Sequence, residues 1–183
     1  MRIIVGITGA SGAMFGVDFV RRCPAEKFLI LTKWGRYVLK EETGLTEPHL
    51  AEHVKRSFAD EDLAAPFSSG SNPFDALVIL PCSVSTMAKI ACGLADTLLT
   101  RTAQVALKER RRLIIGLRET PLSTIALEQA HELSLSGAIV MPISPPFYHR
   151  PQTIEQMVEQ FTDKLLSLLG FETQLAWKPE ALD

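Results

Sequence analysis

Short runs of apolar residues alternate along the chain with stretches whose apolar positions recur at helical spacing. A continuous apolar run between turn residues predicts a strand buried on both faces, as in a parallel sheet covered by helices. The runs that predict strands are Arg2–Ile7, Lys27–Leu31, Ala76–Leu80, Leu113–Leu117 and Ala138–Met141. The stretches that predict helices are Ser11–Arg22, Gly35–Glu42, Ser83–Cys92, Leu98–Glu109, Leu122–Ser136 and Ile154–Leu169.

This alternation predicts an α/β fold, with an open, doubly wound, mostly parallel sheet of the Rossmann-like or flavodoxin-like kind in three layers. The 183 residues fit a single domain, with a final helix at 154–169 and a short tail at 171–183. Two segments rich in proline, serine and glycine, 60–73 and 142–151, predict loops beside strand ends. Because open α/β sheets bind ligands outside the carboxyl ends of their strands, we expect the functional site there.

Composition and charge exclude several classes of protein. The formal net charge is −2, which gives no electrostatic footprint for DNA or RNA. No apolar run reaches the ~18 residues of a membrane span, and the N-terminus predicts a first strand rather than a signal peptide. We therefore expect a cytoplasmic protein. The odd number and wide spacing of the three cysteines argue against a disulfide framework, and the four histidines form no metal-binding cluster.

The turn after the first strand, Gly6–Ala13, is rich in small residues. Small residues let the backbone approach an anion, and N–H groups at a helix start can bind phosphate. The alternative is a tight turn that binds nothing. The glycine spacing differs from the dinucleotide fingerprint, and the second strand ends in Leu31-Thr32-Lys33-Trp34 without an acidic residue for ribose hydroxyls. A mononucleotide, with its phosphate near Gly9–Ser11, therefore fits better than NAD.

Three further segments follow predicted strands or lie in a predicted loop. The hydroxyls of Ser83–Thr86, after the strand at 76–80, either bind a phosphate or ring carbonyl or simply cap a helix. Arg118-Glu119 follows the strand at 113–117, and an arginine there suits a phosphate. The aromatic pair in Phe147-Tyr148-His149 either stacks on a planar cofactor or packs on the surface of a proline-rich loop.

In this order and spacing, the motifs resemble those of the UbiX-type flavin prenyltransferases, long known as small subunits of aromatic-acid decarboxylases. The resemblance runs from Arg2 to about Gly170 and rests on IVGITGASGA, SSGS, ILPCS, LADTLLTRTAQVALKERRRLI, RETPLS and PPFYHRPQT. It implies that the protein binds FMN and, without a metal, joins a dimethylallyl group from dimethylallyl phosphate to N5 and C6 of reduced FMN. It further implies a UbiD-type decarboxylase as recipient of the prenylated FMN, and a homododecamer with active sites between subunits.

The same resemblance implies site residues by their positions in this sequence. Those expected to bind FMN are Gly9, Ala10, Ser11, Thr32, Ser83, Val84, Ser85, Thr86 and Arg118. Those expected to bind the prenyl phosphate are Arg101, Lys108, Glu119, Tyr148 and Lys164. Catalytic roles are implied for Glu42, near flavin N5, and for Lys108 and Glu119.

The chain departs from the family pattern at Ser85, where many members have lysine, at Lys164, where many have arginine, and at Trp34. Trp34 replaces a small residue common in the ubiquinone-pathway branch, so both ubiquinone and aromatic-acid metabolism stay open as the pathway. Two other functions also stay open. One is a flavin-dependent cysteine decarboxylase, although the PxMNxxMW-like loop of those enzymes is not found. The other is an accessory subunit that carries FMN without catalysis.

Overall fold

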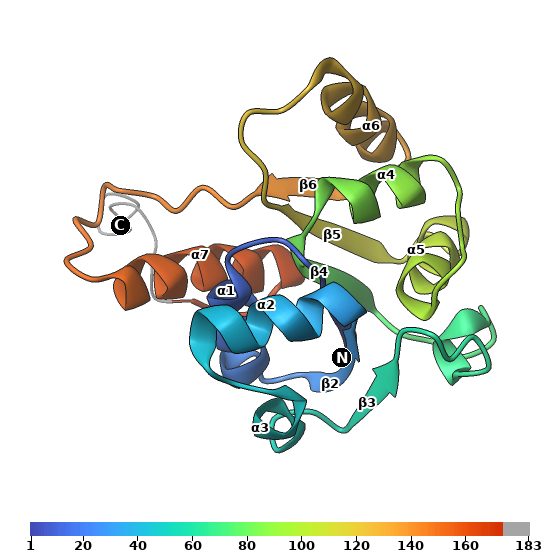
Figure 1. The fold of residues 1–183 in the computed structure, drawn as a ribbon, viewed down its shortest axis with the longest axis horizontal. Coiled ribbons are helices and arrows are strands. Elements are labelled where there is room, and N and C mark those ends of the chain that lie inside the picture. The colour runs from blue at the N-terminus through green and yellow to red at the C-terminus, as the bar shows by residue number, and fades with distance from the viewer. Residues whose placement is uncertain (174–183) are drawn as a thin grey trace. The chain divides into compact units, whose positions relative to one another are not determined.

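The computed structural model describes residues 1–173, whose strands form one parallel sheet in the spatial order β3-β2-β1-β4-β5-β6 (Figure 1). The strands are β1 (Arg2–Ile7), β2 (Glu26–Leu31), β3 (Arg56–Ala59), β4 (Ala76–Cys82), β5 (Arg112–Leu117) and β6 (Ile139–Pro142). The helices are α1 (Ala13–Arg22), α2 (Lys33–Thr43), α3 (Glu47–Ala51), α4 (Val84–Ala91), α5 (Leu98–Lys108), α6 (Thr124–Leu135) and α7 (Ile154–Leu169), with a 3₁₀ turn, η1, at Pro66–Ser68.

The chain divides into two compact units, Met1–Ile143 and Ser144–Asp183. The first contains the whole sheet with α1 to α6, and the second contains α7. The expectation of a single domain stays a prediction. No helix within residues 1–173 offers an apolar stretch long enough to cross a bilayer.

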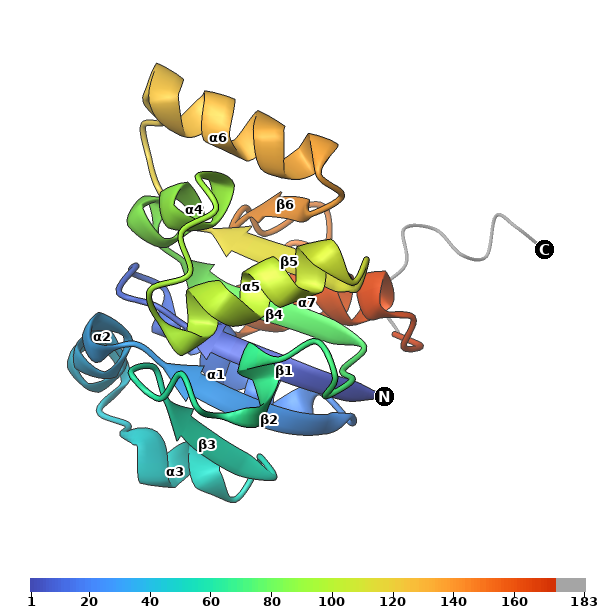
Figure 2. The same ribbon diagram turned by 90° about the vertical axis from the view of Figure 1, so that its right-hand side faces the viewer.

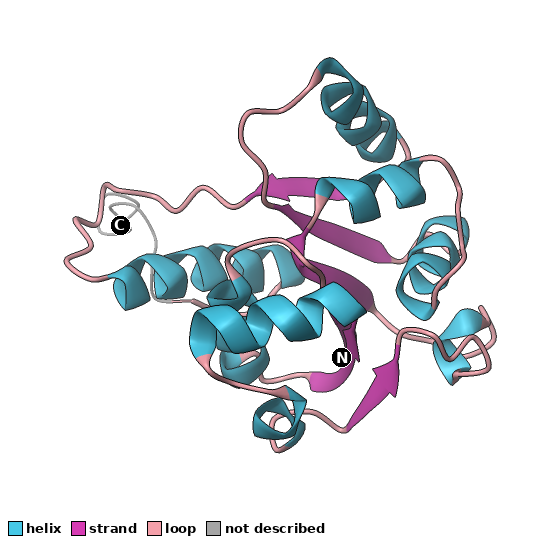
Figure 3. Ribbon diagram, in the orientation of Figure 1, coloured by secondary structure: helices cyan, strands magenta, loops and turns pink. Residues whose placement is uncertain are grey.

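The first unit is wound in two directions from β1. The chain proceeds from β1 to β2 and β3 through α1 to α3, and then from β4 to β5 and β6 through α4 to α6. Because parallel crossovers are right-handed, the two series of helices lie on opposite faces of the sheet. Helix α1 contacts β1 and β4, whereas α5 covers β4 and β5 (Figures 2 and 3). The predicted doubly wound α/β fold is confirmed, and its switch point lies between β1 and β4.

The central strands are buried as their apolar runs predicted. All seven residues of β4 are buried, as are five of the six in β1. In contrast, β3 was not predicted, because only Phe58 of its four residues is buried at this edge of the sheet. Helix α1 begins at Ala13 rather than Ser11, because Gly12 adopts a left-handed conformation with φ of 96°.

Candidate functional site

A pocket of about 520 Å³ lies at the carboxyl ends of β1 to β4. Gly9, Thr32, Asp60 and Ser83 line it, and each follows directly or closely after one of these strands. The pocket therefore lies at the switch point of the sheet, where open α/β folds bind their ligands. Of the residues predicted to bind FMN, it brings together Gly9, Thr32, Ser83, Ser85 and Thr86.

One buried hydroxyl joins the two strands at the switch point. Thr8 is 1% exposed, and its Oγ1 donates to the carbonyl of Pro81 at 2.9 Å. The same oxygen accepts from the backbone N–H of Ser83 at 2.8 Å. Because Thr8 lies in the glycine-rich turn and Ser83 precedes α4, these bonds hold the turn and the start of α4 side by side. Sequence reasoning did not identify this role of Thr8.

Close packing at two glycines brings α2 against the end of β1. A Cβ atom on Gly9 would lie far inside the van der Waals distance of the Trp34 Cβ, and one on Gly35 would meet the carbonyl oxygen of Ile7. Thr32 caps α2 by accepting from the N–H of Gly35 at 2.9 Å. Trp34 is consequently held at the pocket, with 61% of the residue exposed.

The start of α4 combines a helix cap with the pocket wall. Ser83 Oγ accepts from the N–H of Thr86 at 3.2 Å and donates to Thr86 Oγ1 at 3.1 Å. The capping alternative raised by the sequence is thus present, and it orients two hydroxyls that also line the pocket. Ser85 lies between them and is exposed. Val84, the first residue of α4, is half-buried.

Glu42 reaches the other side of the glycine-rich turn from the end of α2. Its Oε2 accepts from the backbone N–H groups of Gly12 and Ala13, both at 2.8 Å. A carboxylate at this position favourably meets the positive end of the α1 dipole. Ala10, which is buried, and Ser11, which is exposed, belong to the same turn. The structure therefore places Glu42 at the turn predicted to contact FMN.

Arg118 and Glu119 lie at the same edge of the sheet, where β5 ends. The N–H of Arg118 donates to the carbonyl of Cys82 at 3.0 Å, which holds the residue beside the end of β4. Glu119 is exposed, and its Oε1 accepts from the N–H of Thr120 at 3.0 Å. Both residues thus neighbour the pocket without lining it.

Helix α5 carries two predicted residues, Arg101 and Lys108, that do not line the pocket. Arg101, near its start, donates from Nε to the carbonyl of Ser68 at 2.8 Å and so holds the end of η1. Lys108 is the last residue of α5 and pairs with Glu109. At a rise of about 1.5 Å per residue, Lys108 lies about 15 Å along the helix from Leu98. A single chain does not bring Lys108 to its own pocket.

Tyr148 and Lys164 belong to the second unit. The ring of Tyr148 lies 4.4 Å from that of His149, measured between centroids. Lys164 is exposed on α7, whose bounds match the predicted helix. The role of these two residues at the pocket stays a prediction.

Several residues that line the pocket were missed by sequence reasoning. Asp60 follows the unpredicted strand β3; its Oδ1 accepts from the N–H of Leu99 at 2.9 Å, while burial raises the pKa of its carboxyl. Lys89 lies one turn after Ser85 on α4, a spacing that would have revealed it. The missed residues are Lys33, Trp34, Asp60, Glu61, Lys89, Thr97, Leu99 and Thr100. Within residues 1–173, no group of three or more His, Cys, Asp or Glu side chains is placed to hold a metal.

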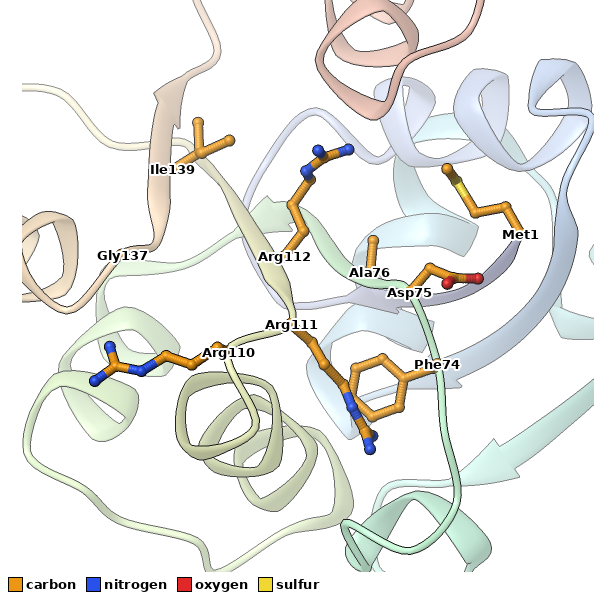
Figure 4. A pocket seen from close by; sticks show the side chains of 9 residues that line it. All are labelled: Met1, Phe74, Asp75, Ala76, Arg110, Arg111, Arg112, Gly137 and Ile139. Atoms are coloured by element: carbon orange, nitrogen blue, oxygen red, sulfur yellow. The ribbon is translucent and has the colours of Figure 1, made fainter.

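A second cavity, of about 610 Å³, lies at the opposite, amino edge of the sheet (Figure 4). Three consecutive arginines, 110–112, line it together with Asp75 and Phe74. Arg111 stacks over the Phe74 ring at 4.5 Å and donates to the carbonyls of Gly70 and Asn72. Figure 4 shows the Arg110 and Arg112 side chains extending in different directions. Arg111 thus has a structural role, and the arginines do not converge on one anion site.

Comparison with known proteins identifies the family to which the chain belongs. Residues 1–165 match the protein family described as "Flavoprotein". The chain is 43% identical over 176 residues to "Flavin prenyltransferase UbiX" of Thermoplasma acidophilum, which covers 96% of this chain and 98% of that protein. It is 39% identical over 173 residues to the "Probable UbiX-like flavin prenyltransferase" of Bacillus subtilis, covering 93% of this chain and 85% of that protein.

Two solved structures extend the similarity to the fold. AnUbiX (PadA1), in complex with FMN and dimethylallyl pyrophosphate, matches with a TM-score of 0.91 and 38% identity over 97% of this chain and 98% of that chain. A dodecameric FMN-dependent UbiX-like decarboxylase from Escherichia coli O157:H7 matches with a TM-score of 0.93 and 37% identity, at the same coverage. The chain therefore belongs to the flavoprotein family and, within it, to the UbiX-type flavin prenyltransferases.

Proposed function

We propose that this protein joins a dimethylallyl group from dimethylallyl phosphate to N5 and C6 of reduced FMN. The observation that carries the proposal is the pocket at the switch point, lined by Gly9, Thr32 and Ser83, in a chain of the UbiX family. The solved relative with FMN and dimethylallyl pyrophosphate supports this pair of ligands. We expect the prenylated FMN to pass to a UbiD-type decarboxylase, and the protein to act in the cytoplasm.

The pocket fits FMN in size and chemistry. Its volume of about 520 Å³ falls within the range of about 300–1,000 Å³ usual for cofactor and ligand sites. Hydroxyl groups of Thr32, Ser83 and Thr86 supply neutral donors for a phosphate or a ring carbonyl. The exposed indole of Trp34 offers a planar apolar surface to an aromatic ring system.

Reduced FMN, when bound, supplies the electron-rich N5 and C6 that form the new bonds. The chain supplies the surroundings. Glu42, fixed by the N–H groups of Gly12 and Ala13, can hold or move a proton at the turn. Arg118, with cations of the prenyl-phosphate site, neutralises the leaving phosphate in place of a metal. Holding both substrates in one site contributes proximity, worth up to ~7–11 kcal/mol in favourable cases.

Prenyl transfer is tested directly by incubating the protein with reduced FMN and dimethylallyl phosphate in the presence of a metal chelator. We expect the flavin to gain one dimethylallyl group, as measured by mass spectrometry. Bound FMN of unchanged mass would instead support the accessory-subunit alternative. Decarboxylation of a cysteine-ended peptide, without prenyl transfer, would support the cysteine decarboxylase.

We expect Lys108 to serve the pocket of a neighbouring subunit, because it lies at the far end of α5 from its own pocket. The dodecameric relative supports such sharing. Subunits carrying Lys108→Ala and subunits carrying Glu42→Gln, each expected to lose most activity alone, should regain part of the prenyl transfer when unfolded and reassembled together. Each variant reassembled by itself is the control. No recovery in the mixture, despite normal assembly, would show that Lys108 does not serve the pocket of a neighbouring subunit.

Tyr148 and Lys164 are expected to bind the phosphate of dimethylallyl phosphate, since a hydroxyl and an ammonium suit that group. The double substitution Tyr148→Phe with Lys164→Ala should raise the KM for the prenyl donor about tenfold or more, while FMN affinity stays close to normal. Lys164→Arg, which keeps the charge, is the matched control. Weaker FMN binding with an unchanged donor KM would show that these residues serve the flavin.

A further inference from the structure

Lys89 lines the pocket, and the proposed function gives it no role. It lies on α4, four residues after Ser85 and three after Thr86. These spacings place the three side chains on one face of the helix. The Lys89 side chain is 38% exposed, so its ammonium is accessible to a ligand. A cation thus stands one helical turn beyond two of the hydroxyls predicted to contact FMN.

Asp96, in the loop before α5, fixes the position of this cation. Its Oδ2 lies 2.7 Å from Lys89 Nζ, and its Oδ1 accepts from Thr100 Oγ1 at 3.3 Å. Thr100 and Thr97 cap each other reciprocally at the start of α5, and both line the pocket. Asp96 therefore holds the ammonium, and Thr100, in the first turn of α5, holds Asp96.

The charges around the pocket indicate that a bound phosphate needs a cation such as Lys89. A bound phosphate monoester carries about −1.5 to −2 charges at neutral pH, while the pocket also contains Asp60 and Glu61. The other lysine that lines the pocket, Lys33, has its ammonium over the Trp34 ring, 5.5 Å from the ring centroid. A lysine has three donors, so Lys89 can keep its bond to Asp96 and still donate to a phosphate.

We infer that Lys89 is a further binding residue of the flavin site, whose ammonium binds the phosphate of FMN, and that Asp96 is its positioning residue. This inference rests on the proposed function only in taking FMN as the ligand of the pocket. It adds a charged contact to hydroxyl contacts, and charge-assisted hydrogen bonds are roughly twice as strong as neutral ones.

The test compares FMN with riboflavin, which has the same ring system and no phosphate. Dissociation constants for both are measured by flavin fluorescence on the flavin-free full chain. Lys89→Gln should weaken FMN about ten- to a hundredfold and leave riboflavin unchanged within about twofold. Asp96→Asn should weaken FMN by a smaller factor, again sparing riboflavin. Lys89→Arg should keep most of the affinity, and Lys40→Gln, at an exposed lysine on α2, is the control.

Two outcomes would overturn the inference. Equal weakening of FMN and riboflavin would show that Lys89 contacts the ring or merely maintains the fold. Unchanged affinity for both flavins would show that the ammonium serves only Asp96. The wild-type prenyl-transfer assay is read separately. Normal, Lys89-dependent binding of FMN without prenylated product would contradict the proposed function and leave the role of Lys89 intact.

Discussion

Replacing Glu42 with glutamine is expected to remove most prenyl transfer and to leave FMN bound. Glutamine keeps a side-chain oxygen that can accept from the N–H groups of Gly12 and Ala13, so the glycine-rich turn should hold its shape. The substitution removes the charge and the proton-transfer capacity. Losing a general acid or base typically costs about 10²–10⁴-fold in rate. Turnover at saturating donor and the FMN dissociation constant are measured on the same preparation.

The neighbouring exposed glutamate provides the control. Glu41→Gln should change turnover by less than about twofold, as expected of a surface substitution. Full turnover in Glu42→Gln would refute a catalytic role for the carboxylate. A collapse of FMN affinity would instead assign Glu42 to maintaining the turn.

A valine at position 9 is expected to cause the second large effect, on FMN binding. The Cβ of any larger residue at Gly9 would overlap the Cβ of Trp34, so the turn or the start of α2 must move. Overpacking of this kind costs about 1–3 kcal/mol. If the turn and the start of α2 regain their positions only when FMN binds, this cost is taken from the binding free energy. The affinity for FMN then falls by up to about a hundredfold, at 1.4 kcal/mol per factor of ten.

Thermal unfolding and FMN titration of Gly9→Val separate a local effect from loss of the fold. Because the clash is with a Cβ atom, combining Gly9→Ala with Trp34→Gly should relieve it, and Gly9→Ala with Trp34→Ala should not. Wild-type FMN affinity in Gly9→Val would contradict the proposed role of the contact in shaping the pocket.

The sheet centre was predictable because its strands are apolar on both faces. In β1 and β4 nearly every residue is buried, which leaves a continuous run that no other element explains as well. An edge strand sends no such signal. In β3 only Phe58 is buried, so the strand was not predicted. Asp60, which follows this strand, was therefore not placed at the pocket. Helix α7 was predictable to its bounds because Thr153 caps it and Gly170 ends it.

The candidate site was predictable only for residues that directly follow a strand, because the sheet topology then decides where they lie. Thr32 and Ser83 follow parallel strands, so the topology alone brings them to one edge. Trp34 and Lys89 depend on how α2 and α4 pack, which one sequence does not specify. Lys108 shows the converse case. Its motif placed it among the site residues, and the structure places it at the far end of α5.

Helix α5 also restricts which changes of length the chain can tolerate. It begins at the pocket with the reciprocal caps of Thr97 and Thr100 and ends at Lys108. With 3.6 residues per turn, one inserted or deleted residue within it would rotate the far end by about 100° and shift it by about 1.5 Å. The side chain of Lys108 would then point in a different direction relative to the start of α5 at the pocket. Insertions and deletions are therefore expected in the loops that flank α5 rather than within it.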